Sequence, residues 1–220
     1  MSTTETDVRP SDGDDGFDDD LELEHDTRER RVSDRTLGVL LVVLGGVALA
    51  AASVLTYDKF KITENPQAAL SCDFNPFVSC GGVMTQPQAE VFGFPNSFMG
   101  MIGFAVVVTI GMVLLGGSRL AGWVWGGLQV GVVLGMAFIV WLMTQSIFAI
   151  GALCPYCMVV WAMMIPIFWY VTRRNLVAVS GGRPGAAARV VVDYHVLLVF
   201  VSYVVVIGTI LAVFGDKLWA

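Results

Sequence analysis

Long apolar runs without charge dominate the chain from residue 36 onward. A membrane-spanning helix needs about 20 mostly apolar residues, because backbone polar groups find no water in hydrocarbon. Three runs have this length and composition, namely Thr36–Tyr57, Ser97–Leu115 and Tyr194–Gly215. The pattern therefore predicts a transmembrane helix over each of them.

The interval Leu120–Thr172 also lacks any charged residue, and it is too long for one span. As a single helix it would extend about 80 Å, against a hydrocarbon core of about 30 Å. Proline disfavours helix in the residue before it and favours a first helical turn, so the break is expected just before Pro155. The interval then holds two spans, Ala121–Phe148 and Pro155–Val171. The predicted fold class is an all-α membrane protein with five transmembrane helices.

The first of these two spans carries glycine at four-residue spacing, at Gly127, Gly131 and Gly135. Small residues repeated in this way let transmembrane helices approach each other closely. We expect the stripe to serve helix packing and assign it no chemistry.

Acidic residues are concentrated at the N-terminus. Thirteen of the nineteen Asp and Glu residues lie before residue 35, although the whole chain is 55% hydrophobic with a mean hydropathy of +0.70. A segment this polar has little apolar surface to bury against the entropy cost of ordering. We expect residues 1–35 to form a disordered acidic tail, followed by a chain too apolar for an ordinary soluble domain.

Basic residues are unevenly divided between the two sides of the predicted spans. The side of the tail has Arg28, Arg30, Arg31, Arg35, Arg119, Arg173, Arg174, Arg183 and Arg189, and the other side has Lys59, Lys61 and Lys217. Because cytoplasmic loops carry an excess of Lys and Arg, we expect a cytoplasmic N-terminus and an extracytoplasmic C-terminus. An outer loop then covers 58–96 and a cytoplasmic loop covers 173–193. The first span is expected to be an uncleaved anchor rather than a signal peptide, because a long tail precedes it.

All four cysteines fall on the predicted outer side, with Cys72 and Cys80 in the outer loop and Cys154 and Cys157 at the start of the fourth span. Extracytoplasmic compartments of bacteria are oxidising, and four cysteines allow three disulfide pairings. With Pro155 as the first helical residue, Cys154 sits at the cap, where free backbone N–H groups stabilise a thiolate. The spacing resembles that of thioredoxin-type redox proteins.

Two other readings of the cysteines remain open. Two structural disulfides would make the chain a non-enzymatic membrane scaffold. A four-thiolate zinc site has the right number of ligands, but the Cys-x7-Cys spacing of the loop is loose for zinc. We expect no metal.

The ordered combination of motifs resembles the vitamin K epoxide reductase family, especially its bacterial homologues. The motifs are Cys72–Cys80 with Ser79 before the second cysteine, the following Gly-Gly-Val-Met, the segment Phe92–Ser97 entering the second span, and Cys-x-x-Cys opening the fourth. The resemblance covers about residues 37–172 and leaves the acidic tail outside.

The resemblance implies a four-helix bundle around a quinone at 36–172, to which this chain adds a fifth helix at 194–215. It implies a quinone-dependent thiol-disulfide oxidoreductase of the bacterial inner membrane that supports disulfide bond formation, with menaquinone or ubiquinone as electron acceptor and no nucleic-acid partner. Cys72 and Cys80 would take electrons from a reduced DsbA-like thioredoxin-fold protein of the periplasm. Cys154 would exchange with Cys80, and Cys157 would reduce the quinone.

The resemblance also places side chains around the quinone. Asn96 would donate a hydrogen bond to a quinone carbonyl, with an N-cap of the second span as its alternative role. Ser79, Met84 and Trp161 are the other expected contacts. Animal members carry tyrosine where this chain has Trp161 and phenylalanine where it has Met84, so activity on vitamin K epoxide is the alternative rather than the expectation.

Two further expectations concern neighbouring parts. The amphipathic segment Gln86–Phe92 is expected to lie over the quinone as a lid, as the corresponding segment of the family does. Several bacterial members carry a fused thioredoxin-like domain. Because this chain ends at Ala220, shortly after the fifth span, we expect the thiol partner to be a separate protein.

Overall fold

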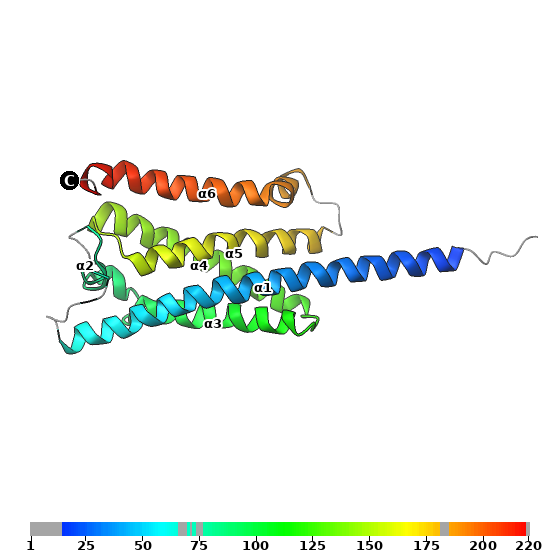
Figure 1. Cartoon of the computed structure of the whole chain (residues 1–220), viewed down its shortest axis with the longest axis horizontal. Coiled ribbons are helices and arrows are strands. Elements are labelled where there is room, and N and C mark those ends of the chain that lie inside the picture. The colour runs from blue at the N-terminus through cyan, green and yellow to red at the C-terminus, as the bar shows by residue number, and fades with distance from the viewer. Residues whose placement is uncertain (1–14, 66–69, 71, 74–76, 181–184, 219–220) are drawn as a thin grey trace, which may run out of the picture.

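The architecture is that of a helical bundle, seen here in a computed structural model (Figure 1) that describes residues 15–65, 70, 72–73, 77–180 and 185–218. The elements in chain order are α1 (Asp15–Glu64), α2 (Cys80–Met84), the 3-10 turn η1 (Pro87–Glu90), α3 (Asn96–Leu115), α4 (Gly122–Thr144), the π-helical turn η2 (Gln145–Ile150), α5 (Pro155–Val179) and α6 (Ala186–Leu218).

Within the part of the chain that the structure describes, five helical segments are long and apolar enough to cross a membrane. They are Asp34–Glu64, Asn96–Leu115, Gly122–Ile150, Pro155–Val179 and Ala188–Gly215. Each contains or closely overlaps one span predicted from the sequence. The break falls just before Pro155, as predicted from the preference of proline for the first helical turn. The prediction of an all-α membrane protein with five transmembrane helices is confirmed.

Helix α1 begins further upstream than predicted. The structure gives residues 15–35 as part of this 50-residue helix, whereas the sequence predicted a disordered tail there, and residues 1–14 lie outside the described residues. Extending an existing helix avoids the unfavourable nucleation step, and residues 17–35 contain no glycine or proline to stop it. Charge density therefore marked where the apolar span begins, and not where the helix begins.

The predicted loop at 173–193 is also largely helical. Helix α5 continues to Val179 and α6 starts at Ala186, so the connection between the two helices is much shorter than expected. The same physical reason applies, because hydropathy reports the apolar part of a helix while the backbone hydrogen bonds continue past it.

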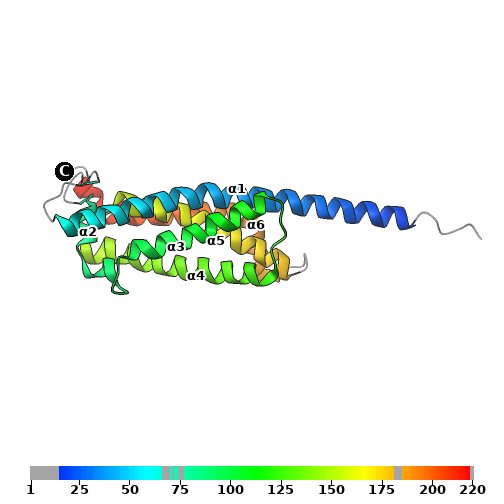
Figure 2. The ribbon, with the colours of Figure 1, turned by 90° about the horizontal axis from the view of Figure 1, so that it is seen from below.

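The helices pack side by side along one direction. Helix α1 lies against α3 and α5, and α5 also contacts α4 and α6, as the two views show (Figures 1 and 2). The fully buried side chains Leu41, Ile167 and Val171 place the core where α1 meets α5. Helices α1, α3, α4 and α5 thus form the bundle, and α6 is added on the side of α5.

Helices α1 and α3 cross at close range. A Cβ atom added at Gly111 of α3 would lie 2.8 Å from Val42 Cγ2 and 3.0 Å from the Gly38 carbonyl oxygen of α1. The glycine stripe expected on α4 does not play this role. At Gly127 and Gly131 an added Cβ meets nothing within 4 Å, and only Gly135 is close to another helix. Tertiary packing, not four-residue spacing, determines which glycines are needed.

Gly111→Ala is expected to destabilise the bundle by about 1–3 kcal/mol, because the new methyl group overlaps the α1 backbone and overpacking costs this much. The matched change Gly127→Ala adds its methyl group in open space and should leave stability unchanged or slightly raised. Equilibrium unfolding of both variants in detergent micelles measures the difference. Equal stability of the two variants would contradict the close α1–α3 crossing.

Candidate functional site

The four cysteines converge at one end of the bundle. Cys72 and Cys80 form a disulfide with an S–S distance of 2.02 Å, while Cys154 and Cys157 are free thiols. Cys80 Sγ also lies 3.5 Å from Cys154 Sγ, and both residues are 0% exposed. The loop pair and the helix-start pair are thereby in contact through one sulfur of each.

A short backbone pairing holds the two pairs together. Val78 and Leu153 form a parallel bridge, in which Leu153 N–H donates to Phe77 O at 2.7 Å and Ser79 N–H donates to Leu153 O at 3.0 Å. Val78 lies two residues before Cys80, and Leu153 immediately precedes Cys154. Because both bonds are made by the backbone, they fix the distance between the two cysteines whatever the side chains nearby.

Ser79 serves the local structure of this loop. Its Oγ accepts from Gly82 N–H at 2.9 Å as the N-cap of α2, and it donates to Asp73 Oδ1 at 2.7 Å. The same Asp73 oxygen accepts from Gly81 N–H at 3.1 Å. Ser79 thus has a capping role, which short polar residues fill well, and its contact with a quinone stays a prediction.

Cys154 occupies the position that the sequence predicted. It is the N-cap of α5, in extended conformation, and Pro155 follows as the first helical residue. A hydrogen bond from the Cys157 thiol lowers the pKa of Cys154, and burial opposes this while the backbone N–H groups of Cys157 and Tyr156 add to it. Cys154 is thus the thiol of the pair prepared to act as thiolate, the form that attacks disulfides.

The titration of Cys154 should depend on its neighbour. In a chain with Cys72→Ser and Cys80→Ser, Cys157→Ala is expected to move the Cys154 titration to higher pH, because the largest cause of its lowered pKa is gone. Cys157→Ser keeps a hydroxyl donor and should move it less. Thiolate absorbance followed against pH gives the result. A Cys154 titration unmoved by Cys157→Ala would contradict the hydrogen bond as the cause.

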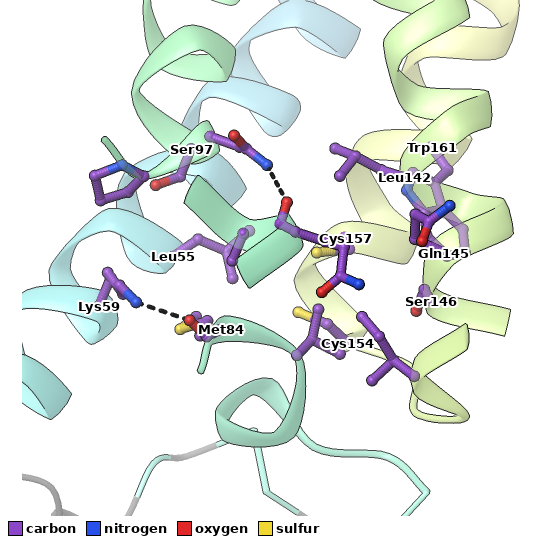
Figure 3. A pocket seen from close by; sticks show the side chains of 16 residues that line it. Leu55, Lys59, Met84, Ser97, Leu142, Gln145, Ser146, Cys154, Cys157 and Trp161 are labelled. Atoms are coloured by element: carbon purple, nitrogen blue, oxygen red, sulfur yellow. Dashed lines mark hydrogen bonds between the residues drawn. The ribbon is translucent and has the colours of Figure 1, made fainter. Parts of the chain in front are cut away.

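A cavity opens beside the helix-start pair, between α1, α2, η1, α3, η2 and α5 (Figure 3). Its lining is mostly apolar with a few amide, hydroxyl and charged groups: Leu55, Lys59, Val83, Met84, Gln88, Ala89, Pro95, Asn96, Ser97, Leu142, Gln145, Ser146, Ile150, Cys154, Cys157 and Trp161. The predicted contacts Met84, Asn96 and Trp161 all line it. A concave apolar site with a few polar groups is typical of a site for a small molecule, and two thiols, Cys154 and Cys157, lie at its wall.

Asn96 lines the cavity but is engaged with the segment above it. Its Nδ2 donates to Gln88 O at 2.7 Å and its Oδ1 accepts from Val91 N–H at 3.2 Å. The expected N-cap role is not found, because Pro95 is the N-cap of α3 and Asn96 is its first residue. Asn96 ties the η1 segment to α3 and retains one N–H of its amide for a ligand.

The predicted lid segment lies over this cavity. Within Gln86–Phe92 the chain forms η1, whose Gln88 and Ala89 line the cavity, and Phe92 packs against Phe138 of α4 at 5.7 Å between ring centroids. Lys59 of α1 holds the segment from the other side. Its Nζ donates to Met84 O at 2.7 Å and pairs with Glu90 at 2.8 Å. We call this arrangement the Lys59 clasp, since it joins α1, α2 and η1.

The polar residues of the cavity that sequence reasoning missed include Lys59, Gln88 and Gln145. Lys59 counted only as a charge in the topology argument, although it lies at the end of the apolar run that faces the cysteines. Gln145 is the first residue of the π-helical turn, a feature often found at functional sites. Its signal in the sequence was an amide near the end of a largely apolar span.

The chain was compared with models of known protein families. A model described as the vitamin K epoxide reductase family matches residues 39–172. The match covers α3, α4 and the four cysteines, includes most of the α1 and α5 spans, and leaves out the N-terminal part of α1 and all of α6.

Proposed function

The chain belongs to the vitamin K epoxide reductase family of membrane oxidoreductases, and from that premise we propose that it catalyses thiol-disulfide exchange coupled to quinone reduction. The proposed direction runs from a reduced DsbA-like thioredoxin-fold protein, through Cys72/Cys80 and Cys154/Cys157, to a quinone of the membrane. The observation that carries the proposal is the 3.5 Å distance between Cys80 Sγ and Cys154 Sγ, with Cys80 also bonded to Cys72.

The first exchange passes two electrons from the partner to the loop pair. A partner thiolate attacks the Cys72–Cys80 disulfide, and a second partner thiol closes the partner's own disulfide, which leaves Cys72 and Cys80 as thiols. Cys80 thiolate then attacks the Cys154–Cys157 disulfide at Cys154. Closure of Cys72 onto Cys80 restores the loop disulfide and releases Cys154 and Cys157 as a dithiol. Each step forms one S–S bond and breaks one.

The last step passes the same two electrons to the quinone. Closure of the Cys154–Cys157 disulfide releases two electrons and two protons, which convert a quinone to a quinol. The cavity supports this step because apolar side chains such as Leu55, Leu142 and Trp161 suit a flat ring, and amide groups suit its oxygens. Quinones lie well above dithiols in potential, so electrons flow toward the quinone.

The proposal places the reaction on the extracytoplasmic side of a bacterial inner membrane. The arginines of the connections and tail lie on the side away from the cysteines in the predicted topology, and positive residues favour the cytoplasm. The partner is a periplasmic thioredoxin-fold protein, because only the oxidising side of the membrane keeps such disulfides.

The proposal is tested with the purified full chain in nanodiscs and a reduced DsbA-like protein. We expect loss of partner thiols that depends on added quinone and that stops when Cys80 is replaced by alanine. Partner oxidation without any dependence on quinone would rule out the proposed acceptor. No partner oxidation at all would favour a disulfide-stapled scaffold, and epoxide-dependent turnover with a dithiol would favour the vitamin K type of reductase.

A further inference from the structure

We infer that Gln88 accepts a hydrogen bond from a ring hydroxyl of the reduced quinone, so that the cavity binds the quinol more tightly than the quinone. The inference rests on the proposed quinone reduction and adds to it a preference for the product. It starts from one unpaired atom. Gln88 Oε1 is the one buried side-chain nitrogen or oxygen without a hydrogen-bond partner among the residues that the structure describes.

The position of Gln88 is fixed by its backbone. Gln88 O accepts from Asn96 Nδ2 at 2.7 Å, and the next turn of the chain is held by Val91 N–H, which donates to Asn96 Oδ1 at 3.2 Å. Pro87 begins the short η1 turn and restricts the backbone just before it. The side chain of Gln88 therefore lines the cavity from a segment that two hydrogen bonds attach to α3.

Three other polar side chains of the cavity already have partners. Ser97 Oγ accepts from Thr56, and Ser146 Oγ donates to Ala152 O. The ammonium group of Lys59 is bound to Met84 O and Glu90. A buried polar atom without a partner is costly and rare in proteins, so an unpaired acceptor at the wall of a cavity indicates that a ligand supplies the donor.

The hydrogen-bonding groups of the quinone and of the quinol determine which of the two forms Gln88 binds more tightly. A quinone offers two carbonyl oxygens, which only accept hydrogen bonds, whereas a quinol offers two hydroxyl groups, which also donate. An acceptor such as an amide oxygen can pair only with the quinol. When the Cys154–Cys157 disulfide closes and two electrons and two protons reach the ring, one new hydroxyl gains Gln88 Oε1 as its partner.

Binding of the two redox forms can be measured without turnover. The probe is 2,3-dimethyl-1,4-naphthoquinone and its hydroquinone, titrated anaerobically into the full chain in nanodiscs with Cys157→Ser, which prevents electron transfer from the helix-start pair. We expect Gln88→Met to weaken hydroquinone binding by roughly five- to tenfold, the scale of one lost hydrogen bond, and to change quinone binding by less than about twofold.

Two further variants separate the hydrogen bond from its alternatives. Gln86→Met removes an amide from the same segment, but Gln86 lies outside the cavity and donates to Gly82 O at 3.3 Å, so both affinities should stay as they were. Gln88→Glu keeps acceptor oxygens and loses the amide N–H groups, so the preference for hydroquinone should persist at a pH where the carboxylate is charged.

The outcomes decide between the inference and the proposed function. If Gln88→Met weakens both forms equally, or neither, the inference is wrong while quinone binding stands. If Gln88→Glu loses affinity for the quinone form, the Gln88 amide donates instead of accepting, which also overturns the inference. If neither form binds the chain that retains Gln88, the proposed quinone site fails and the inference fails with it.

Discussion

Replacing Cys157 with alanine is expected to abolish quinone-dependent oxidation of the thiol partner and to trap a disulfide between Cys80 and Cys154. The two sulfur atoms lie 3.5 Å apart, and a disulfide needs them to close to about 2.05 Å. Cys154 thiolate attacks Cys80 and displaces Cys72, and without Cys157 the only internal thiol that can resolve the product is Cys72, by the reverse of this attack. The rate of partner oxidation should fall at least about a thousandfold, the scale of losing a catalytic nucleophile.

Peptide mapping under non-reducing conditions identifies the trapped bond. The matched variant Cys80→Ala with Cys157→Ala should show no such linkage and should leave Cys154 available to alkylation after unfolding. A Cys72–Cys154 linkage in the Cys157→Ala variant would contradict the assignment of Cys80 as the sulfur that meets the helix-start pair. The close approach is set by the Val78–Leu153 backbone pairing, so the result does not depend on the quinone or the partner.

Replacing Lys59 with methionine is expected to lower quinone-dependent turnover by about 10- to 100-fold. The Lys59 clasp is the link between α1, the C-terminal end of α2 and the segment over the cavity, and its side chain is only 17% exposed. Its hydrogen bond to Met84 O involves a charged donor, a type that stabilises proteins by about 1.5–3 kcal/mol. Losing it leaves Met84 O without that partner and frees both α2 and η1 to move away from the cavity.

The size of this effect separates the two contacts of Lys59. Glu90 is 44% exposed, and exposed ion pairs contribute about 0–1 kcal/mol, so Glu90→Gln should lower turnover by less than about threefold. Initial rates measured against quinone concentration give both values. Reaction of the Cys72–Cys80 disulfide with a small thiol should be nearly unchanged in both variants. Equal losses for Lys59→Met and Glu90→Gln would show that the ion pair, and not the carbonyl contact, holds the segment.

The Lys59 clasp and Asn96 together give the cavity a fixed cover. Lys59 attaches η1 to α1, and Asn96 attaches the same segment to α3 through both ends of its amide. The two attachments come from residues far apart in the chain, and each joins one of the two helices that pack most closely. Movement of α1 against α3 would therefore disturb the cover.

The sequence by itself determined the spans and the start of the fourth one. Hydropathy and proline act locally, because a helix in hydrocarbon satisfies its own backbone and a proline restricts only its neighbours. The five spans, the cap position of Cys154 and the first helical Pro155 follow from these local effects and agree with the structure. The family motifs could also be recognised in the sequence, because each is a short run of residues.

The ends of the helices were not determined in this way. Residues 15–35 and most of 173–193 are helical although their composition is polar, because a helix that has already formed extends at little cost. Hydropathy identifies the part of a helix that contacts lipid, and it does not show how far the helix continues beyond that part. For the same reason the sequence did not show which glycine is needed for close helix packing. Gly111 is identified only by the α1 atoms that face it.

Only the tertiary structure decided how the cysteine pairs and the cavity are built. Cys80 and Cys154 are separated by 74 positions, and their contact depends on the backbone pairing of Val78 with Leu153. The capping role of Ser79 and the approach of Lys59 and Gln88 to the cavity from α1 and η1 became visible only in the structure. Contacts between distant segments depend on how whole helices pack, and no local pattern of residues contains that information.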